Sequence, residues 1–173
     1  MKVAPALLLC FLISFPAASQ AQSLDEIVRR EHAVFDAWTK TPITVRRAVF
    51  VVEGARGYGM YDERPNNVFK PGEKLHMYAE PVGYGWKEKS KGIFEFGFDI
   101  GFVVKDAKGK ILGGNENFSH STLTSHERAR EFMLNLDLSV TGVPDGDYVV
   151  EWQIRDVTGS KTGKFELPFQ IKA

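Results

Sequence analysis

The sequence is poor in cysteine and has no excess of charge of either sign. Its one cysteine, Cys10, lies in an N-terminal apolar run, so the chain after residue 21 offers no disulfide. Its 22 basic residues balance 22 acidic ones, whereas a nucleic-acid-binding domain normally carries a basic excess on one face. The composition excludes a disulfide-stapled scaffold and argues against nucleic acid as a partner. We therefore expect a protein stabilised by one packed core.

Sequence motifs of several enzyme classes are also missing. The chain has no Gly-x-Ser-x-Gly elbow and no Gly-rich phosphate loop that leads into a helix. Glu95 and Asp99 lie four residues apart on one predicted strand, about 13 Å from each other, whereas glycosidase carboxylates lie about 5–9.5 Å apart. We therefore expect a non-catalytic protein without a cofactor. A hydrolase is an alternative that needs carboxylates brought together by the fold.

Residues 1–21 have the three-part pattern of a secretory signal. Lys2 precedes an apolar run from Val3 to Phe15, and small residues follow as far as Ser19-Gln20-Ala21. We expect cleavage after Ala21 and a periplasmic or secreted protein. No later apolar run reaches the roughly 20 residues that a membrane-spanning helix needs. The mature chain is therefore expected not to span a membrane.

Residues 22–42 are predicted to form an amphipathic helix and a short linker. Apolar residues recur mostly every three or four positions, with charged residues between them. Ser23 and Glu26 have the spacing of a capping box, and a Thr-Pro pair ends the helical pattern. We expect the apolar side, anchored by Phe35 and Trp38, to pack on the following domain. A helix that binds a partner is the alternative.

From residue 43 onward, the apolar pattern changes to a two-residue alternation, which is typical of antiparallel strands with one buried face. About seven to nine short strands, separated by turns, predict an all-β fold, specifically an immunoglobulin-like antiparallel β-sandwich over residues 43–173. The predicted strands are Val45–Glu53, a short piece at Tyr58–Tyr61, Lys74–Glu80, Phe94–Val104, Lys110–Leu112, Asn117–Leu123, Phe132–Leu138, Tyr148–Ile154 and Phe165–Ile171.

Two glycines, Gly97 and Gly101, lie on the outward side of the predicted strand Phe94–Val104. Because glycine has no side chain, they leave a shallow track on that side of the strand. We expect the N-terminal helix to cover this track, with a loop or another strand as the alternatives.

The last predicted strand pair begins with the pattern Pro144-x-Gly146-x-Tyr148, which alternating apolar residues, Asp156 and a small Thr158-Gly159 turn follow. This segment resembles the last hairpin of uncharacterised bacterial secreted immunoglobulin-like domains. The resemblance covers about thirty residues and implies architecture only. It places Tyr148 at a tyrosine corner, where the hydroxyl bonds back to the backbone that precedes the strand.

Two aromatic segments flanked by glycines supply the candidate binding residues. The first contains Tyr58 and Tyr61, with Arg64 nearby, and the second contains Tyr84 and Trp86. Aromatic and arginine side chains dominate the energy of many binding surfaces. If both segments lie at one end of the fold, their rings would stack on a sugar or grip a peptide. The alternative is that the rings cap the core.

Metal binding is a further hypothesis, because imidazole and thioether groups are ligands that copper favours. Their spacing in the sequence forms no chelating motif, and neighbours on a strand point to opposite faces. We therefore assign no metal ligand and keep a copper- or zinc-handling protein as an alternative. The residues concerned are His32, His76, His120, His126, Met60, Met77 and Met133.

Together these patterns predict a non-catalytic binding or assembly module of the bacterial cell envelope. We expect its ligand to be another envelope protein, because aromatic segments and an amphipathic helix are both suited to protein surfaces. A glycan is the alternative ligand.

Overall fold

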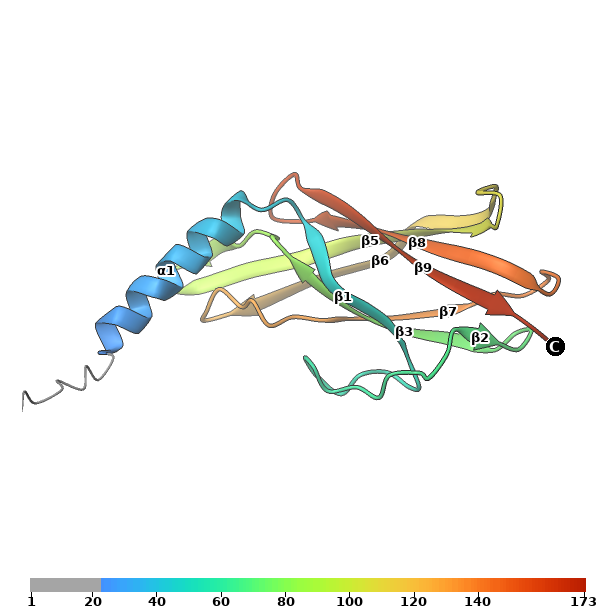
Figure 1. The fold of residues 1–173 in the computed structure, drawn as a ribbon. Helices are drawn as coiled ribbons and strands as arrows, with labels where there is room; N and C mark the ends of the chain where they lie inside the picture. Colours follow the sequence, from blue (N-terminus) through green and yellow to red (C-terminus); the bar gives the residue numbers. More distant parts are fainter. Residues whose placement is uncertain (1–22) are drawn as a thin grey trace, which may run out of the picture.

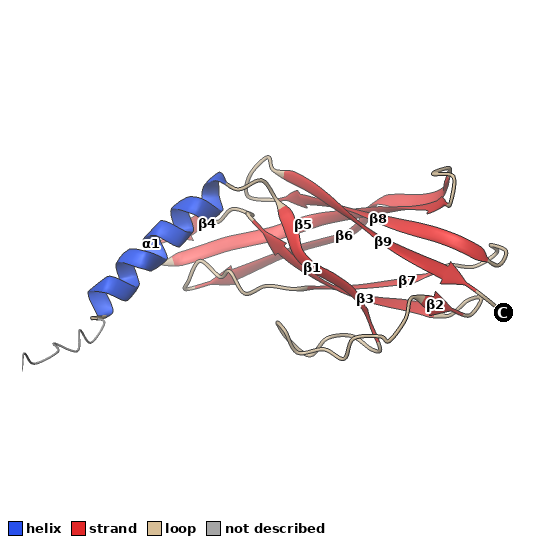
Figure 2. Cartoon of the chain, viewed as in Figure 1, coloured by secondary structure: helices blue, strands red, loops and turns tan. Residues whose placement is uncertain are grey.

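The computed structural model describes residues 23–173, and these form one helix and nine strands. The expected signal sequence and Cys10 lie outside the described residues, so cleavage after Ala21 stays a prediction. The chain is mostly β with one helix, as the sequence predicts (Figure 2).

The helix α1 spans Leu24–Lys40. The Ser23 hydroxyl accepts a hydrogen bond from the backbone N–H of Glu26, which satisfies one of the free donors at the start of the helix. The helix ends at Thr41, whose extended backbone leads into a proline. The predicted capping residue and the end of the helix are confirmed.

The strands follow the predicted alternation in most places. They are β1 (Thr44–Val51), β2 (Val68–Phe69), β3 (Lys74–Val82), β4 (Lys87–Ser90), β5 (Ile93–Asp106), β6 (Ile111–Ser125), β7 (Leu134–Ser139), β8 (Gly146–Asp156) and β9 (Thr162–Ile171).

Three predictions about strands are corrected. The piece at Tyr58–Tyr61 is a loop with isolated bridges. Lys110–Leu112 and Asn117–Leu123 belong to one continuous strand, β6, whose register shifts between the two parts. The two-residue alternation does not indicate β2 or β4, because two and four residues are too few to show it and β4 is exposed throughout.

The strands form two sheets that pack face to face (Figure 1). One sheet has the order β1-β3-β7, and the other has the order β2-β9-β8-β5. The strand β5 pairs with β8 and β4 along one edge and with β6 along the other. The indole N–H of Trp152 on β8 reaches the sulfur of Met77 on β3 at 3.3 Å, which links the two sheets.

The core lies between the sheets and takes alternate apolar residues of β5, β7, β8 and β9. Phe96, Phe98, Leu136 and Trp152 are all buried in it, which confirms that the alternation marks the inner faces. Tyr148 is also buried, and its hydroxyl donates to the carbonyl of Pro144 at 2.6 Å. The predicted bond of the tyrosine corner is therefore present.

The glycine track on β5 is covered by β6 rather than by the helix. A Cβ built at Gly97 would lie 2.1 Å from the carbonyl oxygen of Ser121, and one at Gly101 would lie 2.8 Å from that of Glu116. Only glycine allows the two backbones to approach so closely. The expectation that the helix covers this track is corrected, and the alternative of another strand holds.

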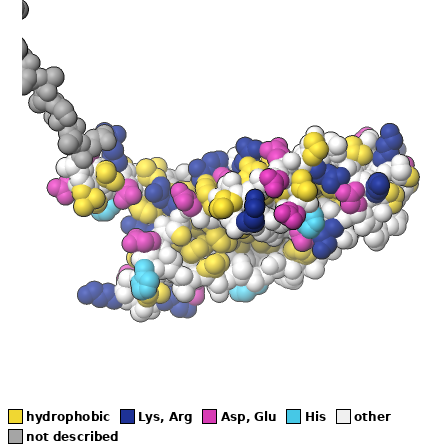
Figure 3. All heavy atoms as spheres, turned by 90° about the horizontal axis from the view of Figure 1, so that it is seen from below, with side chains coloured by type: hydrophobic (Ala, Val, Ile, Leu, Met, Phe, Trp, Pro, Cys, Tyr) yellow, Lys and Arg dark blue, Asp and Glu magenta, His cyan; other side chains and the backbone are white. Residues whose placement is uncertain are grey.

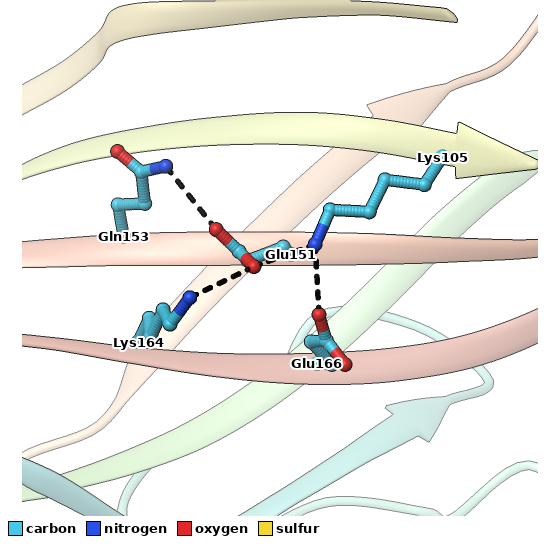
Figure 4. A network of polar contacts seen from close by, with 5 residues as sticks. All are labelled: Lys105, Glu151, Gln153, Lys164 and Glu166. Carbon is cyan, nitrogen blue, oxygen red and sulfur yellow. Dashed lines mark hydrogen bonds and ion pairs between the residues drawn. The ribbon is translucent and has the colours of Figure 1, made fainter. Parts of the chain in front are cut away.

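The outer face of the larger sheet carries a buried carboxylate that two lysines surround (Figure 4). Glu151 accepts hydrogen bonds from Lys105 at 2.7 Å, from Lys164 at 3.3 Å and from Gln153 at 3.3 Å. Lys105 also bonds Glu166 at 2.9 Å. The bond from Lys105 lowers the pKa of Glu151 from 4.5 to about 2, against the opposing effect of burial.

We expect Glu151→Gln to lower the free energy of unfolding only at pH values at which the Glu151 carboxylate is charged in the folded protein. A lowered pKa in the folded state means that the stabilisation is complete above pH 4.5 and disappears as the pH falls through about 2. The difference in unfolding free energy should be about 1–2 kcal/mol near neutral pH, because solvent screens the exposed Lys164. Urea denaturation between pH 2 and pH 7 measures it. Glu166→Gln, at the exposed partner of Lys105, is the control, and an equal loss in both variants would contradict the prediction.

Candidate functional site

The second aromatic segment lies inside the molecule, beneath α1. The Tyr84 side chain is fully buried, and its hydroxyl donates to the carbonyl of Ala129 at 2.9 Å. Trp86 is half-buried between Phe35 and Trp38, with 5.7 Å between its ring centroid and each of theirs. Of these two rings, Tyr84 is enclosed by the protein and does not face a ligand, whereas Trp86 is half-buried against the helix. They form the base on which the helix packs.

The first aromatic segment covers the outer face of the smaller sheet. Tyr61 packs on Tyr78 of β3 with 4.2 Å between the ring centroids, and the guanidinium carbon of Arg47 lies over the Tyr61 ring at 5.5 Å from its centroid. Arg64 bonds Glu73 at 2.8 Å and the carbonyl of Val68 at 2.8 Å. Both Tyr61 and Arg64 are thus held by neighbouring side chains and backbone groups.

Tyr58 differs, because it lines a cleft. The cleft has a volume of about 560 Å³ and lies where α1, β1, β3 and the β6–β7 connection meet. It is lined by Val34, Trp38, Thr44, Arg46, Tyr58, Val82, Arg130 and Glu131. Of the five predicted site residues, only Tyr58 lines it, and Trp38, predicted as a helix anchor, forms part of its wall.

A buried carboxylate organises the polar side of the cleft. Glu80 accepts hydrogen bonds from the hydroxyls of Tyr78 at 2.8 Å and Tyr58 at 3.2 Å, and Arg46 lies 3.4 Å from it. Burial raises the pKa of Tyr78 to about 12 and also raises the pKa of Tyr58. Both phenols therefore stay protonated and act as donors near neutral pH, and Arg46 places a positive charge beside the carboxylate.

The cleft exposes groups suited to binding. Arg46 from β1 and Arg130 from the β6–β7 connection both line it, and guanidinium groups recognise carboxylates and carbonyl oxygens. Arg130 also lies over the ring of Phe35, at 4.9 Å from its centroid, which limits its motion. Trp38 and Val82 add an apolar surface to the same cleft. The arrangement fits a segment that combines an apolar side chain with an acceptor group.

The position of α1 depends on hydrogen bonds to its C-terminal end. The indole N–H of Trp38 donates to the carbonyl of Tyr84 at 2.8 Å. The ammonium of Lys161, from the β8–β9 turn, donates to the carbonyls of Thr39, Thr41 and Gly83 at 2.7–2.8 Å. A cation at this end of a helix also complements the helix dipole. These bonds fix the wall of the cleft that the helix supplies.

Backbone geometry next to Tyr84 makes this close contact possible. Gly83 has φ +85°, and a Cβ there would lie 2.5 Å from the carbonyl oxygen of Pro42. Only glycine suits such a backbone angle and such an approach. The buried Asp156 accepts a bond from the N–H of Gly85 at 2.7 Å, which ties the same segment to the end of β8.

The N-terminal half of α1 projects beyond the strands (Figure 1). Two of its apolar residues are exposed there, with 72% of Leu24 and 47% of Ile27 accessible, and farther along the helix 43% of Val34 is accessible at the cleft. Ile27, Val34 and Trp38 are seven and four positions apart, so they share one side of the helix. This helix row, as we call these three residues, leads from the projecting tip into the cleft. Figure 3 shows hydrophobic side chains among charged ones on the helix, at the left of the view.

The described residues contain no group of three or more His, Cys, Asp or Glu side chains that could hold a metal ion. His76 pairs with Asp137 at 2.7 Å, and His120 pairs with Asp99 at 2.5 Å.

A second hollow of about 460 Å³ lies on the outer face of the larger sheet, where charged and polar side chains such as Arg155 line it. Within residues 23–173, no helix is long and apolar enough to cross a membrane.

Comparisons with known proteins give no family for this chain. No family model matches it, and no curated protein matches it. Among solved structures, the chain is similar to the alkylpurine DNA glycosylase AlkC of Pseudomonas fluorescens bound to DNA containing an abasic-site analogue, with a TM-score of 0.38 and 10% sequence identity. The match covers 86% of this chain and 38% of the glycosylase chain. A likeness this weak carries no argument about fold or function.

Sequence reasoning missed several residues that shape the cleft. The sequence analysis assigns no binding role to Glu80, although its alternation with Tyr78 places both on the outer face of β3. Arg130 lies in a connection without periodicity. Lys161 lies in a surface turn 120 residues from Thr41, its partner at the helix end. Local patterns give no signal for contacts over such separations.

We expect Lys161→Met to loosen the attachment of α1 and lower the stability by about 1–3 kcal/mol, because three carbonyls lose a charged donor. Hydrogen–deuterium exchange should become faster in the last turn of α1 and in the segment around Gly83, with little change in β7. Lys108→Met, in the exposed β5–β6 turn, is the matched control. Unchanged exchange in the last turn of α1 would show that the ammonium does not hold the helix.

Proposed function

We propose that this protein is an exported, non-catalytic binding or assembly module of the bacterial cell envelope, built on an immunoglobulin-like β-sandwich, and that its ligand is another protein. The strand order supports the architecture. In that interpretation, β1, β3 and β7 correspond to strands A, B and E, and β9, β8, β5 and β6 to strands G, F, C and C′. The bond from Tyr148 to Pro144 supports it as well.

The observation that carries the proposed function is the helix row. Ile27 and Val34 are held in the open by a helix whose C-terminal end is fixed to the body. Exposed apolar side chains on a rigid support, next to charged ones, are typical of protein-binding surfaces. The row ends in the cleft at Trp38, so a partner that follows it reaches Arg46 and Arg130.

The chemistry of the cleft favours a polypeptide as the ligand. An apolar side chain of the partner would lie against Val34, Trp38 and Val82, and a carboxylate or a main-chain carbonyl would meet the guanidinium groups of Arg46 and Arg130. A glycan site would need an exposed ring on which a sugar could stack. Of the four predicted rings, only Tyr58 lines the cleft, and it is half-buried.

The N-terminal pattern supports export. A basic residue, an apolar run and small residues before the expected cleavage point make up the three parts of a secretory signal. We expect the mature protein, purified from its native host, to begin at Gln22. Intact-mass measurement of that protein checks this, and a mass that retains residues 1–21 would contradict the predicted cleavage.

Site-specific photocrosslinking in living cells tests the proposed binding surface. A photoreactive amino acid replacing Val34 or Ile27 should give a discrete adduct with one envelope protein. The same substitution at Val52, which is 56% exposed on the loop after β1, should give none. Ile27→Asp should abolish the adduct formed from position 34, because a charge interrupts the apolar row, whereas Val52→Asp should leave it unchanged. Equal adducts at positions 34 and 52 would refute the proposal.

A further inference from the structure

The strand β6 pairs with β5 along one edge only. Within residues 23–173, no strand pairs with its other edge. Most side chains of this 15-residue strand are exposed. A long, unpaired edge presents a row of free N–H and C=O groups, which is a template for another strand.

Two other edge strands, β1 and β4, carry features that oppose such pairing. On β1, Arg46 and Arg47 are exposed and the pairing register shifts at this point. On β4, three of four residues are charged. Charged side chains and bulges are common protections of sheet edges. By contrast, β6 contains no lysine, arginine or proline.

The part of β6 next to its C-terminal end is also regular. Ser119 to Ser125 pair one for one with Ile100 to Phe94 of β5, without a register shift. The irregular part of the strand comes earlier, between the partners of Ile100 and Phe102. The chain therefore presents an edge of seven consecutive residues that is straight enough to take a partner strand.

From His120 to His126, which follows the last residue of β6, the sequence at this edge reads the same in both directions. It is a palindrome centred on Leu123, with the order His120-Ser121-Thr122-Leu123-Thr124-Ser125-His126. When two antiparallel copies pair about this centre, every residue meets one of its own type. In an isologous contact, the same patch of each subunit must be complementary to itself. A palindromic edge meets this requirement residue by residue.

We propose that two copies of this chain form a homodimer by antiparallel pairing of their β6 strands about a two-fold axis at Leu123. The larger sheets of the two copies then join into one continuous sheet. Thr122 of each copy lies opposite Thr124 of the other, and such β-branched and hydroxyl pairs across strands are favourable. The two Leu123 side chains meet beside Phe96, their neighbour on β5.

The composition of the edge favours a second copy over a partner of another kind. The segment from Ser121 to Ser125 has no charged side chain, so two copies approach without like-charge repulsion. Leu123 is 39% exposed in the single chain, and the pairing covers it. This surface is separate from the helix row and the cleft, so the inference does not depend on the proposed function.

A cysteine at the axis tests the geometry. Residues directly opposite each other in antiparallel strands have Cα atoms roughly 4.5–5.5 Å apart, which lies within the range of about 4.4–6.8 Å for disulfides. We expect Leu123→Cys, in a Cys10→Ser background, to form a disulfide-linked dimer under mild oxidation. Leu112→Cys is the matched control, because Leu112 is similarly exposed at 44% on the same strand but lies outside the palindrome. Failure of the Leu123→Cys chain to cross-link, or equal cross-linking of both chains, would overturn the proposal.

Sedimentation velocity over a dilution series tests the association itself. We expect the unmodified protein to show a monomer–dimer equilibrium, which Leu123→Lys abolishes by placing two like charges at the axis. Leu112→Lys should leave the dimer intact. A protein that is monomeric at every concentration, or a dimer that survives Leu123→Lys with its fold intact, would contradict the inference. Far-ultraviolet circular dichroism shows whether each variant is folded. If Leu123→Lys does not fold, cross-linking of the Leu123→Cys variant decides whether the dimer forms.

Discussion

The arrangement of the candidate binding surface depends on the hydrogen bonds that fix the end of α1. Trp38 donates to a backbone carbonyl next to Gly83, and Lys161 joins three carbonyls from both sides of the contact. Because these bonds hold the last turns, the first turns project as a rigid extension. The exposed apolar residues of the helix and the arginines of the cleft therefore keep one fixed relation, which reduces the entropy that a partner must remove on binding.

Much of the fold could be predicted from the sequence, because most of the relevant physics is local. The capping residue Ser23 and the Thr-Pro stop define α1, and two-residue alternation defines the inner faces of β5, β8 and β9. The hydrogen bond from the Tyr148 hydroxyl to the carbonyl of Pro144 follows from the spacing of these two residues in the sequence. In these cases, neighbours within a few residues determine the structure. The stacking of the two sheets follows, because each has one apolar face to bury.

The candidate site was less predictable, because contacts across the chain determine it. A ring flanked by two glycines reads the same whether it is exposed or buried, and Tyr84 is buried because Trp38, 46 residues earlier, packs over it. Tyr61 is covered in the same way by Tyr78. The cleft itself joins five separate segments. No periodicity in a single segment could indicate that they meet.

The β8–β9 turn has a consequence for how this protein can vary. Surface turns usually tolerate insertions and deletions, but here Asp156 and Lys161 at the two ends of the turn both reach the segment beneath α1. A change in the length of this turn would shift one contact relative to the other and swing the helix away from the body. In natural variants, we expect this hairpin to keep its length while other loops change.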